Sequence, residues 1–149
     1  MIKHSEKRHL KYSSDQMFKL VADIESYPAF IPWCSEVNTT SRNSDESKQF
    51  EILEADMRIA FKVFSESFSS KISLDAVAGE INVEHLTGPF NFLTNRWVFT
   101  NVENGCLINF DIKFEFKSRL MQRLIGVVFH EAMKRVVQSF ERRADELYK

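Results

Sequence analysis

The sequence predicts a single α+β domain, in which a curved antiparallel sheet of about six to seven strands packs on one long C-terminal helix. From Ser118 to Tyr148 there is no proline and a single glycine, and apolar residues recur every three or four positions, as on one helical face. From Cys106 to Lys117 apolar residues instead alternate with polar and charged ones, which is typical of a strand with one wet face. The buried face of such a sheet needs a cover, and only the last helix is long enough.

The N-terminal third predicts a strand followed by two short helices. The strand runs from Ile2 to Tyr12 and ends in turn-forming residues. Ser13 and Gln16 have the spacing of a capping box, which starts the first helix. Asp23 is expected to cap the second helix, with Pro28 in its first turn.

The middle of the chain predicts a succession of hairpins. Asn104-Gly105 is the strongest hairpin signal, and Thr87-Gly88-Pro89-Phe90 marks a loop. Expected strands cover residues 35–43, 48–59, 61–74, 80–86, 93–102 and 106–117. In the strand 61–74 the inward face stays open, because one parity carries both apolar and polar side chains: Lys62, Phe64, Glu66, Phe68, Ser70 and Ile72.

The first half of the C-terminal helix is apolar around more of its circumference than one buried stripe requires. Ser118 is its expected N-cap, and apolar residues follow on several sides, among them Leu120, Leu124 and Val127. A helix of this kind is enclosed by protein, lies against a membrane or faces an apolar ligand. Two interpretations stay open: the helix closes a solid core, or its first half roofs a cavity.

Aromatic residues raise the same question. The 149 residues include 14 phenylalanines, which suit either a bulky core or an aromatic pocket. The segment from Tyr27 to Cys34 combines three aromatic residues with Pro28 and Pro32. It is either a rigid elbow that plugs the core or part of a pocket wall.

The overall composition excludes several classes of protein. A net charge of −1 argues against binding to DNA or RNA, since phosphate contacts need clustered cations. Cys34 and Cys106 are far apart, which fits free thiols in a reducing compartment. Neither a signal peptide nor a membrane-spanning run is recognisable. We therefore expect a soluble, cytoplasmic protein whose contact with a membrane, at the inner face, is peripheral.

Signals for chemistry are weak. His4, His9, His85 and His130 have no metal-ligand spacing, and the four glycines form no phosphate loop. Cys34 has no neighbouring base, and no carboxylate pair stands out. The residues favour a binding protein without catalytic residues, metal or cofactor.

Three segments resemble a known family. They are residues 23–34, Gly88-Pro89-Phe90 with the following Leu93, Asn95, Trp97 and Phe99, and the helix end from Val136 to Tyr148. All are similar to the ubiquinone-binding START-domain proteins of the polyketide cyclase/dehydrase-like, helix-grip superfamily. Asn91-Phe92 departs from the pattern, because a basic residue is expected there.

This resemblance implies a lipid cavity between the sheet and the helix that it grips. It implies a non-catalytic protein that holds ubiquinone or a related polyprenyl lipid and supports respiratory electron transport or quinone biosynthesis. The bacterial branch of the family includes ribosome-association toxins, so a ribosome-directed inhibitor is an alternative. A cyclase- or hydratase-type enzyme is another, and it would need titratable groups inside the cavity.

The expected cavity has walls, a roof and a mouth. The helix contributes Leu124 and Val128 as roof, while Trp33 and Phe90 lie near the mouth, where the Gly-Pro-Phe loop is the expected gate. Asn95 and Arg96 are candidate partners for a polar headgroup. The sheet contributes Phe64, Phe68, Trp97, Phe99, Phe110 and Phe114.

Overall fold

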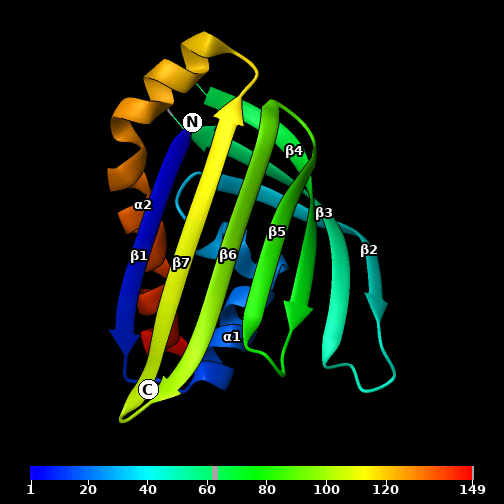
Figure 1. The fold of residues 1–149 in the computed structure, drawn as a ribbon, viewed down its shortest axis with the longest axis vertical. Coiled ribbons are helices and arrows are strands. Elements are labelled where there is room, and N and C mark those ends of the chain that lie inside the picture. Colours follow the sequence, from blue (N-terminus) through cyan, green and yellow to red (C-terminus); the bar gives the residue numbers. More distant parts are fainter. Residues whose placement is uncertain (62–63, 149) are drawn as a thin grey trace.

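A computed structural model describes residues 1–61 and 64–148, without the side chains of Phe61 and Phe64. Seven antiparallel strands form one sheet in the order β1-β7-β6-β5-β4-β3-β2 (Figure 1). The strands are β1 Ile2–Leu10, β2 Cys34–Ser44, β3 Phe50–Phe61, β4 Phe64–Asp75, β5 Glu80–Thr87, β6 Phe90–Val102 and β7 Gly105–Phe116. The predicted fold class and hairpin succession are confirmed.

Three helices complete the fold: α1 Ser14–Ala22, the 3₁₀ helix η1 Ile24–Ala29, and α2 Arg119–Leu147. Both halves of the predicted capping box are present at Ser13 and Gln16. At α2, the Ser118 hydroxyl accepts a hydrogen bond from the Met121 backbone N–H, which confirms the predicted N-cap.

The expectation for η1 was wrong in its details. Asp23 makes no side-chain bond to the free N–H groups of η1, because its carboxylate accepts from the Ser26 hydroxyl instead. Pro28 is the fifth residue of the six in η1, not a first-turn residue. The helix continues past Pro28, because the Phe30 backbone N–H still donates to the Tyr27 carbonyl oxygen.

The sheet has one apolar and one wet face. On β7 the predicted alternation is confirmed, with Cys106, Ile108, Phe110, Phe114 and Phe116 buried. The uncertain face of β4 is settled as well, because Phe68, Ser70 and Ile72 all point to the concave side. Glu66, which has the same parity, is exposed, so only part of this parity is covered.

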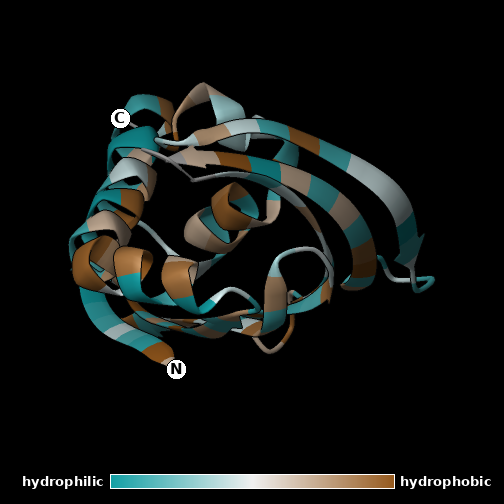
Figure 2. Cartoon of the chain, turned by 90° about the horizontal axis from the view of Figure 1, so that it is seen from above, coloured by the Kyte–Doolittle hydropathy of each residue, from teal (hydrophilic) through white to brown (hydrophobic). Residues whose placement is uncertain are grey.

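The sheet curves strongly around the space on its concave side, and α2 lies across one flank of that space (Figure 2). Register shifts accompany the bending: two in the pairing of β2 with β3, one in that of β4 with β5, and one between Phe90 and Phe92 in that of β6 with β7. The hairpin at Asn104-Gly105 has positive φ at both residues, 65° and 147°. An added Cβ at Gly105 would lie 1.8 Å from the Leu10 carbonyl oxygen, so only glycine fits there.

Two aromatic clusters fill the two ends of this interior. At one end Phe140 of α2 packs against Tyr27, Phe30 and Trp97, with ring centroids 5.1–5.4 Å apart. At the other end Phe114 packs against Phe129 of α2 at 4.7 Å. Between the clusters side chains do not fill the space completely.

Candidate ligand cavity

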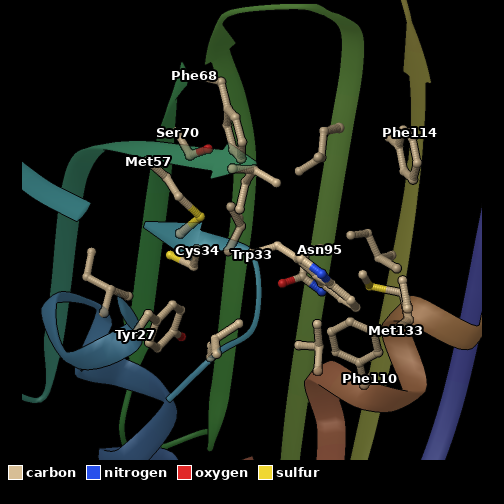
Figure 3. Close-up of a pocket in the computed structure, with 18 of the residues that line it drawn as sticks. Tyr27, Trp33, Cys34, Met57, Phe68, Ser70, Asn95, Phe110, Phe114 and Met133 are labelled. Atoms are coloured by element: carbon tan, nitrogen blue, oxygen red, sulfur yellow. The ribbon is translucent and has the colours of Figure 1, made fainter. Parts of the chain in front are cut away.

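A cavity of about 260 Å³ lies between the concave face of the sheet and α2. Figure 3 shows the labelled side chains converging on it from the sheet, from the segment around η1 and from α2. The helical wall consists of Ile125, Val128, Phe129, Ala132, Met133, Val136 and Phe140. The segment around η1 adds Ile24, Tyr27, Ile31, Pro32, Trp33 and Cys34. The sheet supplies Ala55, Met57, Ile59, Phe68, Ser70, Ile72, Ile81, Val83, Phe90, Leu93, Asn95, Trp97, Phe110, Ile112, Phe114 and Phe116.

Keeping this space open costs stability. Side chains that border an unfilled apolar space lose the packing contacts that a solid core would give them. An apolar ligand would recover part of these contacts, so the cavity favours a bound state.

Most of the residues predicted from sequence for the ligand site lie on this cavity. Seven of them line it: Trp33, Phe68, Phe90, Trp97, Phe110, Phe114 and Val128. The side chain of Phe64 lies outside the described part of the structure. The structure brings the seven together from β4, β6, β7, α2 and the segment after η1.

Two predicted residues do not reach the cavity. Phe99 is buried, but its ring packs edge-on against Phe18 of α1 at 5.8 Å, so α1 covers this end of β6. Leu124 is 46% exposed on the outer side of α2. Val128 lies at the edge of the inner face of α2, and Leu124, about 40° further round the helix, falls outside that face.

Other wall residues were missed. Ile125, Ala132, Val136 and Phe140 share the periodic helical face that the sequence shows, so this face could have supplied them. Ser70 is different, because a serine in an ambiguous strand carries no inward signal. Met57 and Met133 supply flexible thioether side chains to the wall, which adapt to ligands of irregular shape.

Polar groups are few on the wall, and most have protein partners. The Tyr27 hydroxyl donates to the Val21 carbonyl oxygen. Asn95 donates through Nδ2 to the Asp111 carbonyl at 2.9 Å. Arg96, the other expected headgroup partner, instead points to the wet face, where it pairs with Glu80. Adjacent strand residues face opposite sides, so Asn95 and Arg96 cannot both reach one cavity.

Among the described wall residues, only Tyr27 and Cys34 have ionisable side chains. Burial raises the pKa of Tyr27 far above its usual value. Burial also raises the pKa of the Cys34 thiol to about 11. Both groups are therefore neutral at pH 7, and the wall carries no charge.

The histidines lie outside the cavity wall. His4 of β1 places Nδ1 at 2.9 Å from Nδ1 of His130 on α2, and its Nε2 lies 3.0 Å from Glu6. Across residues 1–61 and 64–148 the structure shows no group of three side chains placed to bind a metal ion. Cys34 and Cys106 are free thiols, as predicted.

The sequence of this chain also matches a family model. The model is described as polyketide cyclase / dehydrase and lipid transport, and it matches residues 10–141. The chain belongs to this family. The resemblance found in the sequence is thereby confirmed.

Two relatives and one solved structure are about 30% identical to this chain. Ribosome association toxin RatA of Rickettsia prowazekii is 30% identical, with all of both chains covered. The mitochondrial coenzyme Q-binding protein COQ10 homolog B of Xenopus laevis is 31% identical over 99% of this chain, which spans 59% of that protein's length. An 18 kDa protein of Caulobacter crescentus has the same fold, with a TM-score of 0.83, 31% identity and 99% of both chains covered.

Enzymes share this fold. The Zhui aromatase/cyclase of Streptomyces superposes with a TM-score of 0.78 at 10% identity, over 99% of this chain and 95% of that one. At this identity the likeness shows the fold alone.

Within the described residues, no helix combines the length and apolar character needed to cross a membrane.

Proposed function

We propose that this protein binds ubiquinone or a related polyprenyl lipid in its cavity, without catalysis, in support of respiratory electron transport or quinone biosynthesis. The observation that carries the proposal is a cavity walled by apolar side chains in a small domain that could have packed solid. Burial of apolar surface, at about 25 cal/mol per Å², supplies the driving force. A relative named as a coenzyme Q-binding protein supports this choice of ligand.

The chemistry of the wall supports a binding role over an enzymatic one. General acid–base catalysis needs a group whose pKa lies near the working pH. The pKa values of Tyr27 and Cys34 move away from neutrality, and the remaining polar side chains of the wall belong to serine, asparagine and tryptophan. A cyclase or hydratase would have little here with which to move a proton.

Mass spectrometry of an organic extract tests the proposal. The protein is purified without detergent from a quinone-producing host and extracted beside an equal amount of an unrelated protein of the same size. We expect a prenylated quinone, or another polyprenyl lipid, at a substantial fraction of one molecule per chain. An extract that contains no more lipid than the control would contradict the proposal.

A lipid-binding protein must also contact a membrane to exchange its ligand. The outer side of α2 offers a surface for such peripheral contact. Leu120, Leu124 and Val127 are 64%, 46% and 84% exposed and follow one another at helical spacing. From residue 117 to 130 the chain contains Lys117, Arg119 and Arg123 and no acidic residue. We infer that this stripe rests on an anionic membrane, with its leucines and valine among the lipids and its cations at the headgroups.

The stripe lies beside the expected gate. The Lys117 backbone N–H donates to the Pro89 carbonyl oxygen at 2.8 Å, which ties the start of α2 to the Gly-Pro-Phe loop. Figure 1 shows the start of α2 and the loop between β5 and β6 at the same end of the molecule. A lipid leaving the bilayer there would have the shortest path into the cavity.

A second candidate function is a role in ribosome association. It is favoured by the relatives named ribosome association toxin, which include one that matches over its full length. Overproduction followed by sucrose-gradient sedimentation tests it. A shift from joined ribosomes to free subunits would support this role, and an unchanged profile at high protein levels would contradict it.

A further inference from the structure

The Ser70 hydroxyl is a buried polar group with no partner. The residue is 6% exposed and lines the cavity from the middle of β4 (Figure 3). Its Oγ forms no hydrogen bond with any described residue. An unsatisfied buried hydroxyl costs about 1–3 kcal/mol, so proteins rarely keep one without a reason.

The surroundings of Ser70 leave room for a ligand atom. Its neighbour in register on β3 is Ala55, whose side chain is small and also lines the cavity. The other polar wall groups differ, because Tyr27, Asn95 and Trp97 direct their side-chain N–H or O–H groups to protein acceptors. Ser70 therefore supplies an available donor inside an otherwise apolar wall.

A second unsatisfied group lies opposite Ser70. His85 on β5 is its partner in register, so the two side chains share the concave face. The His85 Nδ1 atom is buried and has no hydrogen-bond partner in the described part of the chain. Burial, with the nearby Lys117, lowers the pKa of His85, and a hydrogen bond with the Phe90 backbone acts in the opposite direction. The net shift is downward, so the ring is neutral at pH 7.

Both groups lie near the Gly-Pro-Phe loop. The Phe90 ring packs edge-on against His85 and against Phe68, each at 5.3 Å. A Cβ added at Gly88 would lie 2.5 Å from Phe68 Cβ and 3.1 Å from His85 Cε1, so the loop closes tightly on this end of the wall. The two unpaired polar groups, the Ser70 hydroxyl and His85 Nδ1, therefore lie next to the expected gate.

We propose that Ser70 forms the polar end of the cavity and hydrogen-bonds an uncharged oxygen of the ligand, while His85, its neighbour in register, lies outside the cavity lining. The inference rests on the proposed lipid-binding function and narrows the ligand class. A quinone carbonyl, an ester or an alcohol fits, with its apolar tail along the aromatic wall. A fatty-acid carboxylate does not fit, because the described wall holds no cation to offset a buried negative charge.

Three probes with known chemistry test the proposal by displacement of Nile red: decylubiquinone, decylbenzene and palmitate. Decylbenzene has the same tail and a ring without oxygen. In Ser70→Ala we expect decylubiquinone to bind about three- to tenfold more weakly, the effect of one lost hydrogen bond. Decylbenzene should bind Ser70→Ala as it binds the wild type, and palmitate should bind both proteins least well.

Two further variants separate ligand contact from folding. Ser70→Thr keeps the hydroxyl and should retain most of the preference for the quinone. Ser69→Ala makes the same change one residue earlier, on the wet face where the Ser69 hydroxyl donates to Asp56, and should leave all three affinities unchanged. Without ligand, Ser70→Ala should be at least as heat-stable as the wild type, because it removes an unsatisfied buried group.

Each outcome bears on a different claim. An unchanged ratio of quinone to decylbenzene affinity in Ser70→Ala would overturn the role of Ser70 while leaving lipid binding intact. Palmitate binding above that of decylubiquinone would overturn the uncharged ligand class. Failure of the wild type to bind any probe would overturn the proposed function itself, and this inference with it.

Discussion

The indole Nε1 of Trp97 donates a hydrogen bond to Oδ1 of Asn95, 3.0 Å away, at the wall of the cavity. Trp97 is 4% exposed, and its ring lies 4.6 Å from Phe110 and 5.1 Å from Phe140. Asn95 in turn donates to the Asp111 carbonyl oxygen. These two hydrogen bonds hold the indole in one orientation, with the apolar surface of the ring toward the cavity. Asn95 therefore supports the wall, and its side-chain amide is already hydrogen-bonded.

Replacing Asn95 by leucine should therefore destabilise the protein. The Trp97 N–H would lose its acceptor, and we expect the free energy of unfolding to fall by about 1–3 kcal/mol. Urea denaturation followed by tryptophan fluorescence measures the change. Asn91→Leu is the matched control, because Asn91 is exposed and its side-chain amide donates to Glu115; its effect should stay within about 0.5 kcal/mol. Equal effects from both variants would contradict a supporting role for Asn95.

Local signals in the sequence predicted the elements of the fold well. Ser13 with Gln16, Ser118, and Asn104-Gly105 each act within a few residues, through a cap or a turn, and each has its predicted structure. The alternation on β7 was equally clear, because one of its faces is wet. The start of the second helix was predicted less well. The Asp23 carboxylate accepts a hydrogen bond from the Ser26 hydroxyl and does not cap the helix.

The site was harder to predict because it depends on contacts between distant segments. Aromatic residues were expected on the wall, and most lie there, yet Phe99 is covered by α1 in a way that β6 alone does not reveal. The roles of Leu124 and Val128 separate only once the orientation of α2 about its own axis is known. Ser70 faces inward through its register with Ala55 and His85, and sequence alone does not specify that register.

Adjacent valines on α2 provide a test of the roof. Val128 lines the cavity, whereas Val127 is 84% exposed. Val128→Asp should abolish uptake of decylubiquinone, since a carboxylate would enter an uncharged apolar wall. Val127→Asp introduces the same charge one residue away and should leave uptake from solution unchanged.

Folding has to be checked in the Val128 variant by circular dichroism. Val128→Phe offers an uncharged alternative, because the larger ring fills part of the cavity and should reduce uptake while the fold is kept. Uptake equal to that of the wild type in a folded Val128→Asp protein would contradict the placement of the roof.

The Tyr12 hydroxyl donates to the Asp145 carboxylate and links β1–α1 to the end of α2. This hydrogen bond, with burial, raises the pKa of Tyr12 from 10 to about 12. The folded state therefore keeps a proton that the unfolded state releases, and the stabilisation is complete below pH 10 and lost as the pH rises toward 12.

Tyr12→Phe removes this titration. Thermal unfolding across the alkaline range should show the wild type more stable below pH 10, with the difference between the two proteins narrowing toward pH 12. Because every other tyrosine and lysine is common to both proteins, the difference isolates Tyr12. A gap that stays constant with pH would show that the Tyr12–Asp145 bond does not control this proton.

Membrane contact through the exposed stripe on α2 can be tested separately from ligand binding in the cavity. Leu124→Glu places a negative charge among Leu120, Val127 and Arg123, so it removes apolar contact and weakens attraction to anionic lipids at once. Co-sedimentation with vesicles containing one-third phosphatidylserine should fall several-fold, whereas decylubiquinone uptake from solution should not change, because Leu124 does not line the cavity. Val77→Glu is the control: Val77 is 75% exposed in the turn between β4 and β5, at the opposite end of the molecule from the start of α2 (Figure 1). Loss of vesicle binding in both variants would indicate a general charge effect, and loss in neither would show that the stripe does not contact the bilayer.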